Sequence, residues 1–294
     1  MRDLPPSIKA KSITEIAIPG SHNSGTYSLS KDMPVGSDQS KLIQGIGNIP
    51  TLGRFFKSIL HLWGICQHID IEHQLQIGIR YFDFRVGKVN GQFRIIHGLY
   101  GTKIGNILLE IGQFLAQHPE EIVILDFQRF YDCTKQDHRK IIGFIELAFG
   151  AKLLATYKDD LSLLSLIKDH VQVIVIYDNY YDIHKPFLWS RSFCPNPWAN
   201  TMKVPKLFSF LEGKLMERSF NFLFVTQAIV TPQVKTIIDS SIRGLYQVTK
   251  NVNRKLPHWI KEKASLLMPN IILTDFVSDT EIPALIISLN QKQP

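Results

Sequence analysis

Two short stretches decide the fold class: Ile79-Arg-Tyr-Phe-Asp-Phe-Arg-Val86 and Ile122-Val-Ile-Leu-Asp-Phe127. Each is rich in β-branched and aromatic side chains, and neither alternates strictly between apolar and polar residues. Continuous runs of this kind are typical of strands that are buried on both faces of a parallel sheet. We predict seven strands, because five further runs share these features: Ile16–Pro19, Phe93–His97, Val171–Tyr177, Phe222–Val225 and Ile271–Phe276.

Apolar residues at helical spacing occupy the segments between these runs. One stripe extends from Ile104 to Leu115, and a second extends from Ile141 to Phe149 and ends at Gly150. Two shorter helices are predicted over Leu161–Ile167 and Val234–Ile242. Strands and helices that alternate in this way indicate an α/β protein with crossover connections.

An open doubly wound sheet and a closed β/α barrel both fit this alternation. No Gly-rich phosphate turn follows Ile16–Pro19, and the strands are spread over the whole length, which favours a barrel. Because only seven strands are evident, we predict an irregular (β/α)8 barrel of the TIM type. No linker rich in Pro, Ser or Gly interrupts the chain, so we expect residues 1–294 to form one catalytic domain.

Composition limits the class of partner. The chain has 294 residues, of which 45% are hydrophobic and 20% are charged, and this excludes disordered, collagen-like and coiled-coil proteins. The net charge of +7 favours an anionic partner such as a phospholipid headgroup, a nucleic acid or a phosphate ester. No basic run is interleaved with stacking aromatic residues, so nucleic acid is the least expected of these. Three cysteines are too few for a disulfide framework and indicate reduced thiols in a cytoplasmic protein.

Contact with a membrane is expected to be peripheral. The first residues contain no apolar signal segment, and no run of about 18 apolar residues occurs. Two stretches, Leu42–Cys66 and Trp189–Met202, do not follow the strand–helix alternation. They are either loops folded onto the barrel or a lipid-facing surface. On the second interpretation, the residues that meet the lipid are Phe55, Phe56, Trp63, Trp189 and Trp198.

Polar residues gather at the ends of the predicted strands, where β/α barrels carry their chemistry. His22 follows the first strand, His97 ends the third, and Asp275 lies in the last. Asp83 and Arg85 lie two residues apart and therefore on one face of the second strand. An Arg that points inward is costly unless it is paired or faces an anionic ligand. Further strand-end residues are expected to contact the substrate: Asn23, Gln128, Tyr131, Asp178 and Gln227.

Two imidazoles, two carboxylates and a guanidinium around one cleft suit the cleavage of a phosphodiester. One His takes the proton of the nucleophile, and the other protonates the leaving oxygen. The Arg stabilises the charge on the phosphoryl oxygens.

Four segments of the chain resemble the phosphatidylinositol-specific phospholipase C family. They are Ala17-Ile-Pro-Gly-Ser-His-Asn-Ser-Gly-Thr26, Ile79–Arg85, His97-Gly98 and His118–Phe127. The resemblance is greatest to small eukaryotic members that consist of the X domain alone, and it covers almost the whole chain. It implies an irregular β/α barrel that cleaves phosphatidylinositol to diacylglycerol and a cyclic inositol phosphate.

The resemblance also implies a role for each matching residue. His22 matches the general base of the family, and His97 matches its general acid. Asp275 matches the carboxylate that orients the base. Arg85 matches the arginine that replaces calcium in metal-free members, and Asp83 matches an acidic position expected to pair with Arg85.

No metal or other cofactor is expected. Of the four calcium positions of the family, this chain keeps Asn23 and Asp83 but has Arg85 and Gln128 at the other two. Calcium takes six to eight oxygen ligands, and a guanidinium beside it would cost several kcal/mol at an effective dielectric constant of about 20 or less. The bacterial metal-free members have Asp at the position of Asn23, and an Arg that contacts inositol near the position of Asp178, so these contacts differ here.

Two other functions remain open at this level. A barrel that binds phosphoinositides or other lipids without cleaving them would not need both an acid and a base. A metal-dependent glycerophosphodiester phosphodiesterase would need a Glu-x-Asp pair where this chain has Asp83-x-Arg85. We expect a peripheral membrane enzyme that acts on a phosphatidylinositol lipid and has no obligatory protein partner.

Overall fold

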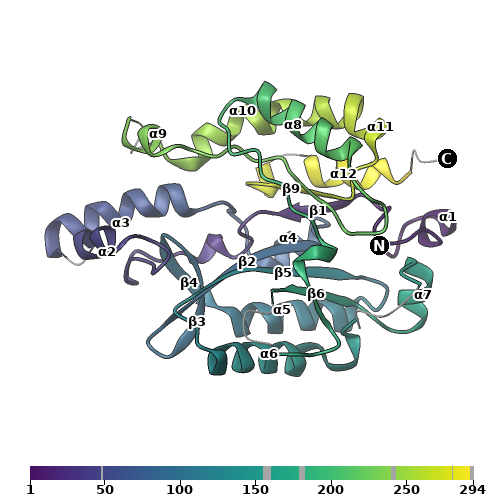
Figure 1. Cartoon of the computed structure of the whole chain (residues 1–294), viewed down its shortest axis with the longest axis horizontal. Helices are drawn as coiled ribbons and strands as arrows, with labels where there is room; N and C mark the ends of the chain where they lie inside the picture. Colours follow the sequence, from purple (N-terminus) through teal and green to yellow (C-terminus); the bar gives the residue numbers. More distant parts are fainter. Residues whose placement is uncertain (48, 155–159, 179–182, 240–242, 280, 292–294) are drawn as a thin grey trace.

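The computed structural model describes residues 1–47, 49–154, 160–178, 183–239, 243–279 and 281–291. Its centre is one curled sheet in which parallel strands follow the order β7-β6-β5-β2-β1-β9-β8 (Figure 1). The predicted irregular α/β barrel is therefore confirmed, in the form of a half-barrel that is open between β7 and β8. The parallel strands are β1 (Ile18–Ser21), β2 (Tyr81–Val89), β5 (Val123–Tyr131), β6 (Val173–Tyr177), β7 (Leu188–Trp189), β8 (Val225–Gln227) and β9 (Ile271–Thr274).

One predicted strand runs in the opposite direction to the others. Strand β3 (Gln92–His97) is antiparallel to β2, and β4 (Leu99–Lys103) pairs with β3 in turn. The register places Val86 opposite Ile95. The end of β3 therefore returns beside the middle of β2, and this return brings His97 to the barrel.

The strands alternate their side chains between two kinds of environment. Phe82, Phe84 and Val86 of β2 belong to a core between the sheet and helices, whereas Tyr81 belongs to a second core that includes residues of β1, β6 and β9. Asp83 and Arg85 share the parity of Tyr81, so this alternation places them on the inner face of the curled sheet. Apolar side chains occupy that face near Tyr81, and polar side chains occupy it further along the strands.

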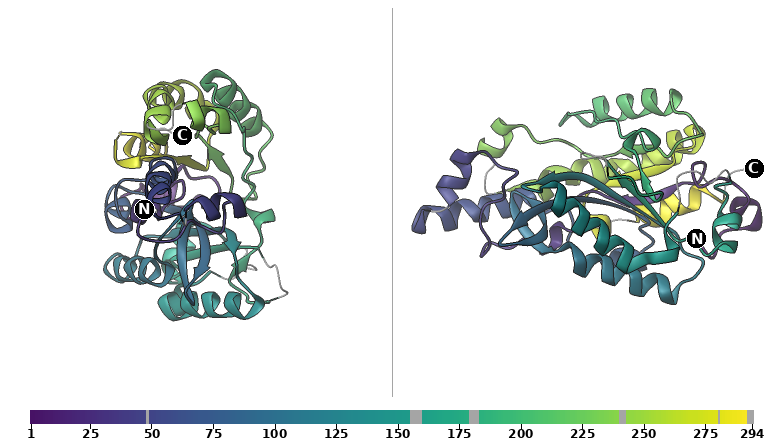
Figure 2. Two further views of the ribbon diagram at one scale, coloured as in Figure 1. Left: turned by 90° about the vertical axis from the view of Figure 1, so that its left-hand side faces the viewer. Right: turned by 60° about the horizontal axis from the view of Figure 1, so that its bottom comes forward.

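Helices lie on both sides of the sheet (Figures 1 and 2). The predicted helices are confirmed as α5, α6, α7 and α9, although residues 240–242 of the last prediction lie outside the described residues. No helix in the described part of the chain has the length and apolar character needed to cross a membrane. The helices are α1 (Pro6–Lys9), α2 (Lys41–Gly47), α3 (Pro50–Gly64), α4 (Ile71–Gln76), α5 (Ile104–Gln117), α6 (Lys135–Phe149), α7 (Leu163–Lys168), α8 (Val204–Met216), α9 (Val234–Asp239), α10 (Gly244–Trp259), α11 (Ser265–Leu267) and α12 (Ile282–Leu289).

The stretch from Leu42 to Cys66 is helical, so the prediction of a loop is wrong there. It forms α2 and α3, and Figure 1 shows both helices at one end of the molecule together with α9. Helix α3 packs against α10 and β4, so its apolar residues cover these elements as well as facing outward. The stretch from Trp189 to Met202 contains only the end of β7 and one helical turn, η3 (Arg191–Phe193), and is otherwise irregular.

Candidate active site

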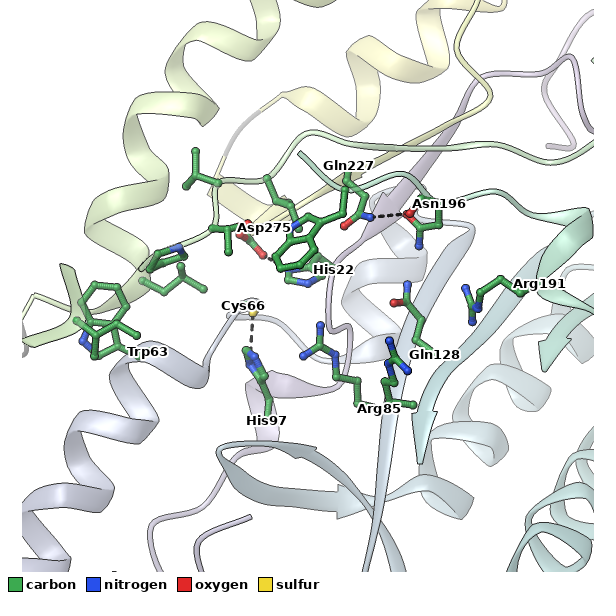
Figure 3. Close-up of a pocket in the computed structure, with 18 of the residues that line it drawn as sticks. His22, Trp63, Cys66, Arg85, His97, Gln128, Arg191, Asn196, Gln227 and Asp275 are labelled. Atoms are coloured by element: carbon green, nitrogen blue, oxygen red, sulfur yellow. Dashed lines mark hydrogen bonds and ion pairs between the residues drawn. The ribbon is translucent and has the colours of Figure 1, made fainter. Parts of the chain in front are cut away.

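A cavity of about 530 Å³ opens at the carboxyl ends of the parallel strands (Figure 3). Seven of the ten predicted site residues line it, although they come from segments far apart in the sequence. They are His22, Arg85, His97, Gln128, Asp178, Gln227 and Asp275. Asn23 and Asp83 are buried directly behind this lining, whereas Tyr131 lies outside it.

His22 and Asp275 form a hydrogen-bonded pair. The Nδ1 atom of His22 lies 2.7 Å from Oδ1 of Asp275, which is only 2% exposed. A carboxylate only accepts, so Nδ1 carries the hydrogen, and Nε2 is the ring nitrogen beside the side chain of Asn23. The side-chain amide of Gln67 donates to the carbonyl oxygens of both His22 and Thr274, at 2.9 and 3.0 Å. Gln67 thereby ties the segment after β1 to the segment after β9, a role that no sequence pattern indicated.

The surroundings of His22 favour its protonated form. Burial alone would lower the pKa of the imidazole, but the Asp275 carboxylate outweighs burial and the pKa is raised to about 10. The side chain of Asn23 lies beside the other ring nitrogen, with 3.1 Å between Nδ2 of Asn23 and Nε2 of His22. An amide can donate to a neutral Nε2 through its nitrogen or accept from a protonated one through its oxygen. Asn23 is therefore compatible with both states of His22.

His97 is oriented by a backbone carbonyl. Its Nδ1–H donates to the carbonyl oxygen of Gly64 over 2.7 Å, so Nε2 is the ring nitrogen left for a ligand. Position 64 accepts only glycine without a shift, since a Cβ there would lie 2.6 Å from the His97 carbonyl oxygen. Burial and the charge of Arg85 lower the pKa of His97 to about 3, which favours the neutral imidazole.

Cys66 lies between the two imidazoles. Its Sγ is 3.4 Å from Nδ2 of Asn23. It is 3.8 Å from Nδ1 of His97 (Figure 3). Burial raises the pKa of the thiol, so Cys66 is neutral near pH 7. No sequence pattern indicates a role for this residue.

Asp83 does not form the ion pair with Arg85 that the resemblance implied. Oδ2 of Asp83 instead accepts from the backbone N–H of Asn23 over 3.4 Å. The reason is depth: Asp83 is 1% exposed behind the loop after β1, whereas the longer side chain of Arg85 extends into the cavity. Within the described residues the Nε atom of Arg85 is buried and has no hydrogen-bond partner, so Arg85 is available to an anionic ligand.

A polar wall lies on one side of the histidines. We use this name for Gln128, Arg129, Asp178, Arg191, Asn196 and Gln227. Arg191 is held by Asp126, with bonds of 2.6 and 3.1 Å, and by Asp178 at 3.3 Å. Asp178 therefore positions an arginine at the site. Gln227 donates to the carbonyl oxygen of Asn196 over 3.1 Å.

A shift in strand register explains why Arg129 belongs to this wall. Phe84 pairs with Phe127, but Arg85 pairs with Arg129, so Gln128 is an extra residue in β5. Alternation of faces does not hold across such a bulge, and two consecutive residues line the cavity. Beyond the bulge, Tyr131 pairs with Gly87 on the part of β2 that forms the hairpin, which places it away from the cavity.

The side chains around the cavity do not fit calcium. His22, Cys66 and Asp275 offer ligand atoms within 4.8 Å of one another. This set contains one carboxylate, one nitrogen and a protonated thiol, whereas calcium prefers six to eight oxygen ligands. The guanidinium of Arg85 lines the same cavity and would repel a cation.

Comparison with known proteins places the chain in a family. Residues 58–177 match the family described as phosphatidylinositol-specific phospholipase C, X domain. PI-PLC X domain-containing protein 2 of Mus musculus is 38% identical over 99% of this chain and 86% of its own length. PI-PLC X domain-containing protein 3 of Homo sapiens is 32% identical over 99% of this chain and 92% of its own length.

Solved structures share the fold at much lower identity. Phosphatidylinositol-specific phospholipase C from Listeria monocytogenes superposes with a TM-score of 0.70 at 16% identity, covering 100% of this chain and 97% of the bacterial chain. A mutant of the Staphylococcus aureus enzyme gives a TM-score of 0.67 at 15% identity, covering 96% and 95%. These structural similarities show a shared fold. The sequence identities of 32 and 38% show membership of a family. The chain belongs to the family of PI-PLC X domain-containing proteins.

Proposed function

We propose that this protein is a metal-independent phospholipase C that cleaves the phosphodiester bond of phosphatidylinositol-type lipids. The observation that carries the proposal is the convergence on one cavity of a His–Asp pair, a second His, and Arg85, whose Nε has no hydrogen-bond partner among the described residues. Simple lipid binding does not require two imidazoles that are each held at Nδ1 by a different acceptor. The family of the chain supports the same substrate class.

The proposed reaction uses the Nε2 atom of each imidazole. The 2-hydroxyl of inositol attacks phosphorus while its proton passes to Nε2 of His22, and the new P–O bond closes a cyclic phosphate. The P–O bond to diacylglycerol breaks as its oxygen takes a proton from Nε2 of His97. Asp275 stabilises the imidazolium that forms on His22, and Arg85 stabilises the charge on the non-bridging oxygens.

Product analysis tests this proposal. Incubation with phosphatidylinositol vesicles should release diacylglycerol and a cyclic inositol phosphate, at the same rate with and without EDTA. Binding to the vesicles with no product would indicate a lipid-binding barrel. Loss of activity in EDTA, with recovery on addition of a divalent metal ion, would indicate a metal-dependent diesterase.

The dependence of kcat/KM on pH should be a broad plateau. Catalysis needs neutral His22 and protonated His97, whereas in the free protein the pKa of His22 is raised to about 10 and that of His97 is lowered to about 3. Between these values the pair holds one proton, so the productive form with this proton on His97 is a constant fraction of the enzyme. The rate falls in acid when both imidazoles are protonated, and in alkali when neither is.

Initial rates on a dissolved short-chain phosphatidylinositol measure this profile. We expect kcat/KM to stay within about twofold from about pH 5 to about pH 9. Circular dichroism at each pH is the control for unfolding. A narrow bell with both limbs near pH 6.5 would show that the two imidazoles do not differ in pKa in this way.

We also propose peripheral contact with lipid through Phe55 of α3 and Trp198 of the irregular segment. Phe55 and Trp198 are 60% and 54% exposed, and Arg54 and Lys57 lie beside Phe55 on α3. Trp63 and Trp189 are 8% and 4% exposed, so the expectation that they insert into a membrane surface is wrong. Trp189 packs in the core, where its indole donates to the carbonyl oxygen of Leu154. The apolar character of the two stretches thus serves both core and surface.

Replacing Phe55 and Trp198 by Ser should weaken vesicle binding about tenfold, because two large apolar side chains no longer enter the lipid. Sedimentation with vesicles that contain anionic lipid measures the change. Leu147→Ser is the matched control, because Leu147 is highly exposed on α6, away from the cavity. An equal loss in the control variant would contradict the assignment of this surface.

A further inference from the structure

The cavity has a second wall of different chemistry. We call Trp63, Ile229, Val230, Ile237 and Leu245 the apolar wall. Figure 3 shows Trp63 on one side of His22 and His97, with Gln128, Arg191 and Asn196 on the other. The two imidazoles therefore lie between Trp63, which packs in one cluster with Leu245 and Ile237, and these polar side chains.

We propose that the apolar wall binds the glycerol backbone and the first acyl carbons of the lipid within the cavity. The proposal rests on the function proposed above and adds a subsite for the leaving group. It predicts that the protein recognises the acyl part of a single dissolved lipid molecule. Recognition of this kind is separate from attachment to a membrane surface.

The position of His97 assigns this wall to the leaving group. The carbonyl of Gly64 holds Nδ1 of His97, and the preceding residue is Trp63 of the apolar wall. Cys66, which lies 3.8 Å from His97, packs in one apolar cluster with Trp63 and Leu245. The proposed acid must touch the oxygen that departs with diacylglycerol. That oxygen therefore lies beside the end of α3, and the glycerol attached to it extends along the apolar wall.

Charge complementarity gives the same orientation. The five side chains of the apolar wall carry no charge, which suits a leaving group without charge. The polar wall offers two guanidiniums, three side-chain amides and a carboxylate, which suit the hydroxyl groups of inositol. The reverse orientation would bury hydroxyl groups against hydrocarbon and leave them without partners.

The apolar wall is part of the packed structure of the protein. Trp63 and Leu245 are buried, and Ile59 and Tyr246 pack against their cluster. Helices α3 and α10 approach closely at Gly244, where a Cβ would lie 2.7 Å from the carbonyl oxygen of Leu62. The wall is therefore formed before substrate arrives, which limits the entropy lost on binding.

Two dissolved substrates test the proposal: glycerophosphoinositol, which has no acyl chains, and dihexanoyl phosphatidylinositol below its micelle concentration. We expect kcat/KM to be at least about tenfold higher for the acylated substrate. Ile237→Ser should lower kcat/KM about fivefold to tenfold for the acylated substrate, and by less than about twofold for glycerophosphoinositol, which keeps only the glycerol contact. Leu245→Ala should have the same effect. Leu245 is buried, whereas Ile237 is half-buried, so Ile237→Ser is the variant expected to disturb folding less.

Ile167→Ser is the matched control, since Ile167 is also a half-buried isoleucine in a six-residue helix, α7, outside the cavity. Equal kcat/KM for the two substrates in the unmodified protein, or an equal loss for both in Ile237→Ser, would overturn the proposal. If neither substrate is cleaved, the proposed function fails. Calorimetric affinities for the two compounds then decide the subsite separately: it stands if the acylated compound binds more tightly and Ile237→Ser removes the difference, and it falls otherwise.

Discussion

Replacing His22 by Ala is expected to lower kcat for phosphatidylinositol cleavage by about 10²- to 10⁴-fold, since no other group takes the proton of the attacking hydroxyl. His97→Ala should cause a loss of the same order, since the leaving oxygen then departs as an alkoxide. Assays of both variants on phosphatidylinositol vesicles, with circular dichroism to confirm folding, measure these changes. Near-normal turnover in folded His22→Ala would contradict the mechanism.

A better leaving group separates the two histidines. An inositol aryl phosphodiester releases a phenolate that needs little protonation, so His97→Ala should recover most of its activity on this substrate. His22→Ala should not recover. His73→Ala is the matched control, because His73 pairs with Asp70 over the same 2.7 Å as His22 with Asp275 but is exposed on α4. Loss of activity in this control would mean that His–Asp pairs matter here for folding.

Arg85→Lys is expected to lower kcat by about 10²- to 10³-fold, which corresponds to about 2.7–4 kcal/mol of transition-state stabilisation. Lysine keeps the charge but loses the planar pair of donors that matches two phosphoryl oxygens. The melting temperature should change little, because Asp83 bonds to the backbone of Asn23 rather than to Arg85.

Measuring kcat and the melting temperature on this one variant separates a catalytic from a structural role. Arg94→Lys on β3 is the control, since Arg94 donates to the carbonyl oxygen of Gly101 and lies outside the cavity. A lower melting temperature for Arg85→Lys with almost normal kcat would assign Arg85 a structural role.

Burial explains which parts of the fold could be predicted from the sequence. Strands β2 and β5 are covered on both faces, so their apolar runs are continuous and easy to recognise. His22 and Asp275 directly follow the last residues of β1 and β9, so their positions follow from the apolar runs. The direction of β3 could not be read from its own residues, because an apolar run has the same composition in either direction. The Asn90-Gly91 turn before it is the signal of a tight hairpin.

Arg129, Arg191 and Asn196 of the polar wall were not predicted, because their positions depend on distant contacts. Arg191 follows β7, a strand of two residues, and it reaches the cavity through Asp126 and Asp178. Asp126 lies within an otherwise apolar run, and such a run predicts a buried core strand. The bulge at Gln128 leaves no trace in the sequence, because it arises from pairing with β2.

The opening between β7 and β8 gives the barrel a seam without a strand ladder. Across it, in the described residues, the backbone N–H of Val225 donates to the carbonyl oxygen of Pro195, and Gln227 donates to that of Asn196. A closed barrel can widen only by breaking a row of cooperative backbone bonds, whereas this one can do so by releasing these local contacts. Amide protons of β8 should therefore exchange with solvent through small openings that leave β2 and β5 intact. The half-barrel can therefore widen at this seam, and the seam borders the cavity.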